Sequence, residues 1–179
     1  MNLTLRKPRT PLDWLRIRLL YRRAFPRYER KPFAIIRRMN KEGRTDVWIA
    51  EGDGRFAGLA TTINGGNTIL LDYLAVHEKL RGQGIGSAML QALLTLYEGR
   101  GLFVEIEATD RDDPTGEKQR RKQFYLRNGL ADMHVVAILF GVRMELLGRG
   151  CKLDFDDYQE FYRTHYNPWA AAHVVRPDD

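Results

Sequence analysis

The sequence predicts an α/β fold, and three observations carry that prediction. The apolar run Leu70–Val76 is typical of a buried strand. A glycine-rich turn follows it, and then a stretch with apolar residues at positions 85, 89, 93, 96 and 97, which is helical spacing. Further candidate strands and helices alternate with this unit along all 179 residues. Strands interleaved with helices in this way are characteristic of the α/β class.

The first half of the chain reads as a strand, two helices and a hairpin. Pro11 is favoured in the first turn of a helix, and Pro32 suits the first turn of a second one. Gly52-Asp53-Gly54 is typical of a tight hairpin turn. The expected elements are a strand at Leu3–Arg6, helices from Pro11 to near Phe25 and over Phe33–Lys41, and strands at Val47–Glu51 and Arg55–Ile63.

The second half adds a strand, a helix, a hairpin and a last helix. Gly99 and Gly129 mark helix ends, and the Asp154–Asp157 segment is a capping signal for the last helix. The expected elements are Leu102–Ala108, Glu117–Asn128, the hairpin Met133–Phe140 with Val142–Leu147, and a helix ending near His165. The tail, Asn167–Asp179, gives no clear signal. Neither a repeat nor a linker is evident, so we expect residues 1–179 to form a single domain.

Composition excludes several classes of protein. Hydrophobic residues make up 44% of the chain, which indicates a globular protein. Cys151 is the only cysteine, which excludes a disulfide framework and a thiolate zinc site. No apolar run approaches membrane-spanning length, and the N-terminus lacks a signal-peptide core, so we expect a cytoplasmic protein without a membrane partner. The net charge of +6 comes from arginines spread over several helices, which disfavours nucleic acid as the partner.

The turn after Leu70–Val76 has the chemistry of a phosphate site. Its glycines let the backbone approach a ligand, the following helix presents its positive end, and Arg81 offers a fixed charge. A Walker loop is excluded because Gly86, not lysine, precedes Ser87. A dinucleotide loop is disfavoured because four residues, His77–Leu80, separate the strand from the loop that begins at Arg81, and because the motif lies mid-chain. A glycine-rich turn with a purely structural role remains an alternative interpretation.

Two motifs resemble one known family. Val76-x4-Arg81-Gly-x-Gly-x-Gly is similar to the pyrophosphate motif of the GCN5-related N-acetyltransferases (GNAT), and Phe124–Leu130 resembles the late aromatic-Tyr-x3-Gly signature of that family. The order of elements also matches over nearly the whole chain. The resemblance implies a mixed, mostly antiparallel central sheet flanked by helices on both faces. It further implies direct transfer of an acetyl group from acetyl-CoA to a primary amine in a ternary complex.

The resemblance assigns the acetyl-CoA contacts residue by residue. The backbone of the strand end would meet the acyl-pantetheine, and the glycine-rich loop would hold the pyrophosphate. The strand residues are Leu74, Ala75 and Val76, and the loop residues are Arg81, Gly82, Gln83, Gly84, Ile85, Gly86 and Ser87. No metal is expected, because the four histidines lack metal-ligand spacing.

Two glutamates alternate with apolar residues along the strand at 102–108. Glu105 and Glu107 therefore point to one face of a strand that is normally apolar. A solvent-exposed strand end, or an ion pair between Glu107 and a helix arginine, would explain them structurally. The segment also resembles the ribosomal-protein alanine acetyltransferases, which implies that Glu105 is the general base. Glu107 and Asp72 remain alternative bases, and the role of Asp110 stays open.

The resemblance places Tyr125 as the general acid that protonates the leaving thiolate, against the alternative of a core aromatic beside Phe124. The linker Phe25–Phe33 is the candidate acceptor wall or, alternatively, an ordinary connection. Its candidate acceptor residues are Phe25, Tyr28, Glu29 and Arg30.

The expected acceptor is a small-molecule amine or a peptide N-terminus. The tail and the late hairpin are candidate surfaces for a homodimer. The alternative function is a catalytically silent CoA-binding sensor or regulatory protein.

Overall fold

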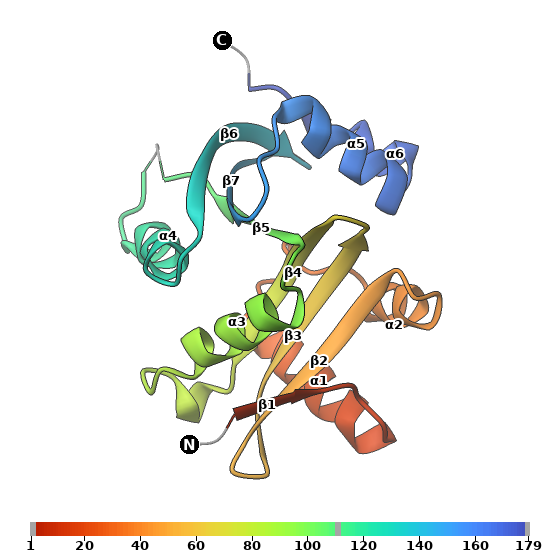
Figure 1. Ribbon diagram of the computed structural model, residues 1–179, viewed down its shortest axis with the longest axis vertical. Coiled ribbons are helices and arrows are strands. Elements are labelled where there is room, and N and C mark those ends of the chain that lie inside the picture. Colours follow the sequence, from red (N-terminus) through yellow and green to blue (C-terminus); the bar gives the residue numbers. More distant parts are fainter. Residues whose placement is uncertain (1–2, 110–111, 178–179) are drawn as a thin grey trace. The chain divides into compact units, whose positions relative to one another are not determined.

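The computed structural model describes residues 3–109 and 112–177 of the protein. Figure 1 shows the elements in chain order: β1 (Leu3–Arg6), α1 (Pro11–Ala24), α2 (Phe33–Lys41), β2 (Thr45–Gly52), β3 (Arg55–Gly65), β4 (Thr68–Val76), the 3₁₀ turn η1 (Glu78–Leu80), α3 (Ile85–Leu96), β5 (Gly101–Glu107), α4 (Glu117–Arg127), β6 (Ala131–Leu139), β7 (Val142–Arg149), α5 (Phe155–His165), α6 (Pro168–Ala171) and β8 (Val174–Val175).

The strands belong to one mixed sheet with the order β1-β2-β3-β4-β5-β7-β6-β8. The pairs β1/β2, β2/β3, β5/β7, β6/β7 and β6/β8 are antiparallel. The pair β4/β5 is parallel and joins Thr68–Leu70 to Gly101–Phe103. The predicted mixed, mostly antiparallel sheet is therefore confirmed.

The chain divides into two compact units. The first comprises the residues up to Asn64 together with Leu71–Leu96, and the second comprises Gly65–Leu70 and the residues from Tyr97 onward.

In the first unit, helices cover both faces of the strands. Ile17 of α1 and Ile36 of α2 pack in one buried cluster with Leu59 of β3. The next residue back, Gly58, faces the other way, because a Cβ built there would lie 2.8 Å from the sulfur of Met89 on α3. α1 and α2 therefore lie on one face and α3 on the opposite face.

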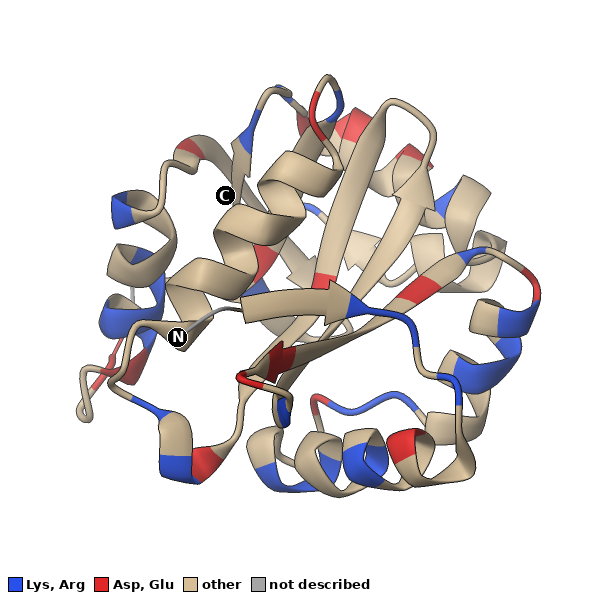
Figure 2. Cartoon of the chain, turned by 60° about the horizontal axis from the view of Figure 1, so that its bottom comes forward, with Lys and Arg blue, Asp and Glu red and all other residues tan. Residues whose placement is uncertain are grey.

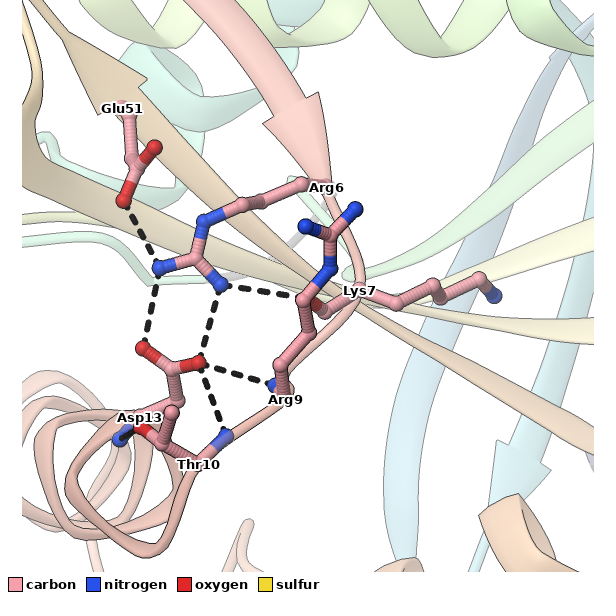
Figure 3. Close-up of polar contacts among 6 residues, drawn as sticks. All are labelled: Arg6, Lys7, Arg9, Thr10, Asp13 and Glu51. Atoms are coloured by element: carbon pink, nitrogen blue, oxygen red, sulfur yellow. Dashed lines mark hydrogen bonds and ion pairs between the residues drawn. The ribbon is translucent and has the colours of Figure 1, made fainter.

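A network of charged groups fixes the start of α1, as Figure 3 shows. Both guanidinium nitrogens of Arg6 donate to the Asp13 carboxylate at 2.9 Å, and one also donates to Glu51 at 2.7 Å. Asp13 and Thr10 form a reciprocal capping box at the helix N-terminus. The hydrogen bonds from Arg6 hold the pKa of Asp13 well below its usual range, although burial alone would raise it. The network ties α1 to β1 and β2.

In the second unit, α5 packs its apolar side onto the aromatic side chain of β5. Phe103 meets Tyr158 and Phe161 edge to face, with ring centroids 6.4 and 5.1 Å apart. The tail that gave no sequence signal is folded as far as it is described: Asn167 caps α6, and β8 pairs with β6.

The late hairpin is longer than predicted. β6 and β7 extend over Ala131–Leu139 and Val142–Arg149, with an irregularity between Asp132 and Val136 where His134 adopts a φ of +58°. Among the described helices, none has the length and apolar character needed to cross a membrane.

Candidate functional site

The glycine loop joins β4 to α3 through a backbone that only glycine adopts easily. After Val76 the chain makes the turn η1, and Gly82 and Gly84 then have φ angles of +75° and +77°. This left-handed region is strained for residues with a Cβ. The backbone conformation therefore requires glycine at both positions.

The loop faces open space. Arg81, Gly82, Gln83 and Gly84 are exposed, and a Cβ built on either glycine would meet no atom within 4 Å. The positive φ angles account for the glycines, and the lack of protein neighbours leaves the backbone of the loop open to a ligand. Ile85 is buried and anchors the start of α3.

The electrostatics of the loop favour an anion. No acidic residue lies in the first turn of α3, where backbone N–H groups lack intrahelical acceptors. Gly86 and Ser87, in this first turn, are partly exposed. The Arg81 Nε donates to the Val76 carbonyl at 3.5 Å, which holds the arginine beside the loop. These groups form a cradle suited to phosphate oxygens.

The end of β4 presents its two faces differently. Tyr73 and Ala75 are buried in the core, while Leu74 and Val76 are only half-buried. The amide of His77 donates to the carbonyl of Ala57 at 2.8 Å, which continues the strand geometry beyond Val76. Residues 74–76 therefore offer an ordered backbone with one partly open side-chain face.

Asp72, one of the alternative bases, is already ion-paired. Its carboxylate lies 2.6 Å from Nζ of Lys31, and its side chain is only 9% exposed. Proton abstraction by Asp72 would have to compete with that pair.

The linker between α1 and α2 is bound to β4 through Tyr73. The Tyr73 hydroxyl donates to the Glu29 carbonyl at 2.8 Å and accepts from the Lys31 amide at 3.2 Å. The ring of Phe25 packs against Tyr73, with centroids 4.8 Å apart. Burial, followed by the nearby Asp72 carboxylate, raises the pKa of Tyr73 well above its usual value, so the hydroxyl stays protonated. The linker is held as a fixed wall.

The other two acceptor candidates differ in exposure. Tyr28 is 74% exposed, whereas Arg30 is half-buried and donates to the Arg22 carbonyl at 3.4 Å. Among the residues that the structure describes, the buried Nε of Arg30 has no hydrogen-bond partner. Phe25 and the Glu29 carbonyl thus fix the linker to Tyr73, by a ring contact and a hydrogen bond, while Tyr28 is exposed to solvent.

The two glutamates of β5 have different partners. Oε1 of Glu105 accepts a 2.8 Å hydrogen bond from the hydroxyl of Tyr158. Glu107 lies 3.7 Å from Nζ of Lys118 on α4. Glu107 thus has a basic partner on a neighbouring helix, but this partner is a lysine and not the arginine suggested by the sequence.

Tyr125 lies on α4 with its ring edge to face against Phe124, at a centroid distance of 5.0 Å. Burial raises the pKa of Tyr125 to about 12, and the positive charge of Arg121 partly opposes this rise. Over the described ranges 3–109 and 112–177, its hydroxyl makes no hydrogen bond. The phenol is therefore protonated at neutral pH. Asp110 lies outside the described residues.

Sequence reasoning missed a polar cluster on the neighbouring strand. Nζ of Lys122 lies 2.7 Å from both Asp132 and Glu145, and Thr109 donates to Glu145 at 3.1 Å. Glu145 is one of the buried charged residues of the chain. Its alternation with apolar neighbours on the predicted hairpin was the available signal. In the described part of the chain, no three His, Cys, Asp or Glu side chains gather as a metal site would require.

Comparison with known proteins gives a family match and several structural matches. Residues 43–129 match the family model described as acetyltransferase (GNAT) domain. No curated protein matches the chain significantly. A GNAT-family protein from Bacteroides thetaiotaomicron has a similar structure, with a TM-score of 0.78, 18% identity and coverage of 96% of this chain and 99% of that one.

Two further structures are similar at a TM-score of 0.63. The ribosomal-protein-S18-alanine N-acetyltransferase of Escherichia coli is 17% identical, over 85% of this chain and 96% of its own. A spermidine N-acetyltransferase SpeG chimera from Vibrio cholerae and hSSAT is 12% identical, over 82% and 93%. At these identities the similarity establishes the fold.

Proposed function

We propose that this chain transfers the acetyl group of acetyl-CoA directly to a primary amine, because residues 43–129 match the family model described as acetyltransferase (GNAT) domain. The observation that carries the proposal is the exposed loop in which Gly82 and Gly84 have positive φ and no protein neighbours. Such a loop at a helix N-terminus is built to take a phosphate against the backbone.

Acetyl-CoA binding would rest mainly on backbone groups. The amides of residues 82–87 and the guanidinium of Arg81 would hold the pyrophosphate, and Leu74, Ala75 and Val76 would contact the pantetheine and acyl group. The GNAT family uses acetyl-CoA, which supports this assignment.

Glu105 is proposed as the general base. It would take a proton from the acceptor ammonium, so that the free amine can attack the carbonyl carbon of the thioester. The bond from Tyr158 supports this role because it orients one carboxylate oxygen. The alternatives Asp72 and Glu107 both lie beside lysine ammonium groups.

Tyr125 is proposed as the general acid. The tetrahedral intermediate collapses by breaking the carbon–sulfur bond, and the phenol would donate its proton to the departing thiolate. With a pKa of about 12 the phenol carries its proton at neutral pH, as a general acid must, but it is a weaker proton donor than an ordinary tyrosine.

The proposed acceptor is a small-molecule amine or a peptide N-terminus. The two named structural matches act on a ribosomal-protein alanine and on spermidine, so the fold accommodates both classes. Tyr28, which is exposed on the linker, is the side chain proposed to contact the acceptor. Phe25, Glu29 and Arg30 would shape the wall behind it.

Two measurements test the proposal. Calorimetry should show acetyl-CoA binding, and a thiol-release assay over a panel of amines and N-terminal peptides should identify an acceptor. Absence of binding at millimolar acetyl-CoA would refute the enzyme assignment. Binding without thiol release for any acceptor would instead favour the CoA-binding sensor.

A further inference from the structure

A cavity of about 350 Å³ opens on the first compact unit. Its walls come from α1, from the β2–β3 hairpin around Gly54 and from residues 77–81 after β4. Cavities that bind small molecules are typically about 300–1,000 Å³, so this one has room for a small ligand.

Four arginines line this cavity. Arg16 and Arg23 come from α1, which runs along the bottom of the view in Figure 2, Arg55 from β3 and Arg81 from the glycine loop. Glu78 is the one carboxylate among the lining residues, and it lies 3.5 Å from Arg23. The walls thus carry an excess of positive charge that an anion would balance.

Two of these guanidinium groups are not used within the protein. In the part of the chain that the structure describes, the side chains of Arg16 and Arg55 form neither a hydrogen bond nor an ion pair. Arg6, on the same unit, shows the contrasting structural role, since its guanidinium is saturated by two carboxylates. Arg16 and Arg55 remain available to a ligand.

The cavity also has an apolar wall. Leu20 is buried and Phe56 packs against the same core cluster, while Leu19 is 47% exposed. All three line the cavity. A bound ion alone would leave this surface in water, whereas a ligand with a ring would cover it. A guanidinium group can also stack on such a ring.

We propose that this cavity binds a small organic anion in which a phosphate or carboxylate group is attached to an apolar ring. Arg16 and Arg55 hold the anionic group, and Leu19 and Phe56 contact the ring. The amine acceptor of the proposed reaction does not fit here, because four arginines repel an ammonium group. The cavity is thus a second ligand site, separate from the acceptor site.

The test measures the binding of phenyl phosphate to the full chain by calorimetry or NMR titration. Inorganic phosphate and phenol are the partial ligands, and both should bind more weakly than phenyl phosphate. Arg16→Gln and Arg55→Gln should each weaken phenyl phosphate binding about tenfold, as expected for lost charge-assisted hydrogen bonds. Arg18→Gln, on the same helix but outside the cavity lining, is the matched control and should bind like the wild type.

A second pair of variants tests the apolar wall. Leu19→Ala should weaken binding of phenyl phosphate but not of inorganic phosphate. Leu15→Ala is its control, since Leu15 is similarly exposed, at 49%, and does not line the cavity. Absence of phenyl phosphate binding at millimolar concentration, or equal losses in the test and control variants, would overturn the proposal.

The phosphates of CoA are another source of the same chemistry, because Arg81 also belongs to the glycine loop. Acetyl-CoA affinity is therefore measured on Arg16→Gln and Arg55→Gln. We expect it to stay unchanged, and a parallel tenfold loss would assign the cavity to the cofactor and overturn the proposal. A wild-type chain without transferase activity that still binds phenyl phosphate would refute the proposed function and leave this site intact.

Discussion

The hydroxyl of Tyr158 on α5 donates a 2.8 Å hydrogen bond to the carboxylate of Glu105 on β5. Tyr158 is fully buried, and its ring packs against Phe103, so the position of the hydroxyl is fixed by the core. The core of the second unit thereby orients the carboxylate that we propose as the base.

Removal of that hydroxyl should affect turnover more than folding. Tyr158→Phe keeps the ring and removes one hydrogen bond, which costs about 1 kcal/mol of unfolding free energy. We expect kcat to fall with little change in acetyl-CoA affinity. Steady-state kinetics and urea unfolding measure the two effects. Tyr162→Phe removes a hydroxyl from the next turn of α5 and should leave kcat unchanged; equal losses of kcat would indicate a general effect on α5.

Neutralising the proposed base should lower turnover strongly. Glu105→Gln removes the proton acceptor at constant shape, and general-base catalysis typically contributes ~10²–10⁴-fold. We expect kcat to fall in that range while calorimetry finds acetyl-CoA affinity nearly intact. Glu107→Gln is the matched control on the same strand and should retain most activity. Full activity in Glu105→Gln would move the base to Glu107, Asp72 or a water molecule.

Tyr125 gives a pH prediction with a definite sign. The neutral phenol is the proton donor, and a pKa raised to about 12 keeps it neutral throughout the ordinary assay range. We therefore expect no alkaline loss of kcat from Tyr125 below about pH 11. Tyr125→Phe should lower kcat at all pH values, and by less than Glu105→Gln, because a thiolate can leave without prompt protonation. An alkaline limb near pH 9 that disappears in Tyr125→Phe would contradict the raised pKa.

The same shift affects stability. The folded state favours the neutral phenol, so the stabilisation is fully present below the unfolded pKa near 10 and is lost as the pH rises toward 12. The free energy of unfolding of the wild type, measured with denaturant, should fall between these pH values. That of Tyr125→Phe should fall less.

A pair of glycine variants distinguishes a role of the loop in acetyl-CoA binding from a general effect of backbone strain on stability. Gly84→Ala places a Cβ where we expect the cofactor to approach, and the left-handed backbone costs about 1–2 kcal/mol of stability. Gly43→Ala is the control, because Gly43 has a φ of +73° and equally open surroundings. Both variants should lose similar stability, and only Gly84→Ala should lose acetyl-CoA affinity by calorimetry. Unchanged affinity in Gly84→Ala would remove the loop from the binding site.

The ion pair between Arg6 and Asp13 should dominate the acid sensitivity of the first unit. The lowered pKa of Asp13 means that its stabilisation is present above the unfolded pKa near 3.8 and is lost as the pH falls through the lower folded value. Asp13→Asn should cost about 3 kcal/mol at pH 7, because it leaves a half-buried guanidinium with a weaker partner. The difference from the wild type, measured by urea unfolding, should shrink below about pH 4. Glu42→Gln, whose carboxylate pairs with Arg44 on the surface, should change little at any pH.

The sequence by itself determined the features whose signals act over a few residues. Helix α2 has the predicted bounds, Phe33–Lys41, although Pro32 is its N-cap and not part of its first turn. Asp154 caps α5 as predicted, because the capping box needs only three further residues. Gly82 and Gly84 were identifiable because a tight strand-to-helix turn with a left-handed backbone requires glycine locally.

Only the tertiary structure decided which distant residues become partners. Tyr158 and Glu105 are 53 positions apart, and Lys122 lies 23 positions from Glu145. Tyr158 lies on α5 and Lys122 on α4, so the packing of these two helices against the strands brings the side chains together. β8, with two residues, is too short to show a strand period and forms because β6 offers it a pairing edge. Hydrogen-bond pairing and close packing select such partners across the folded chain, so local periodicity carries no record of them.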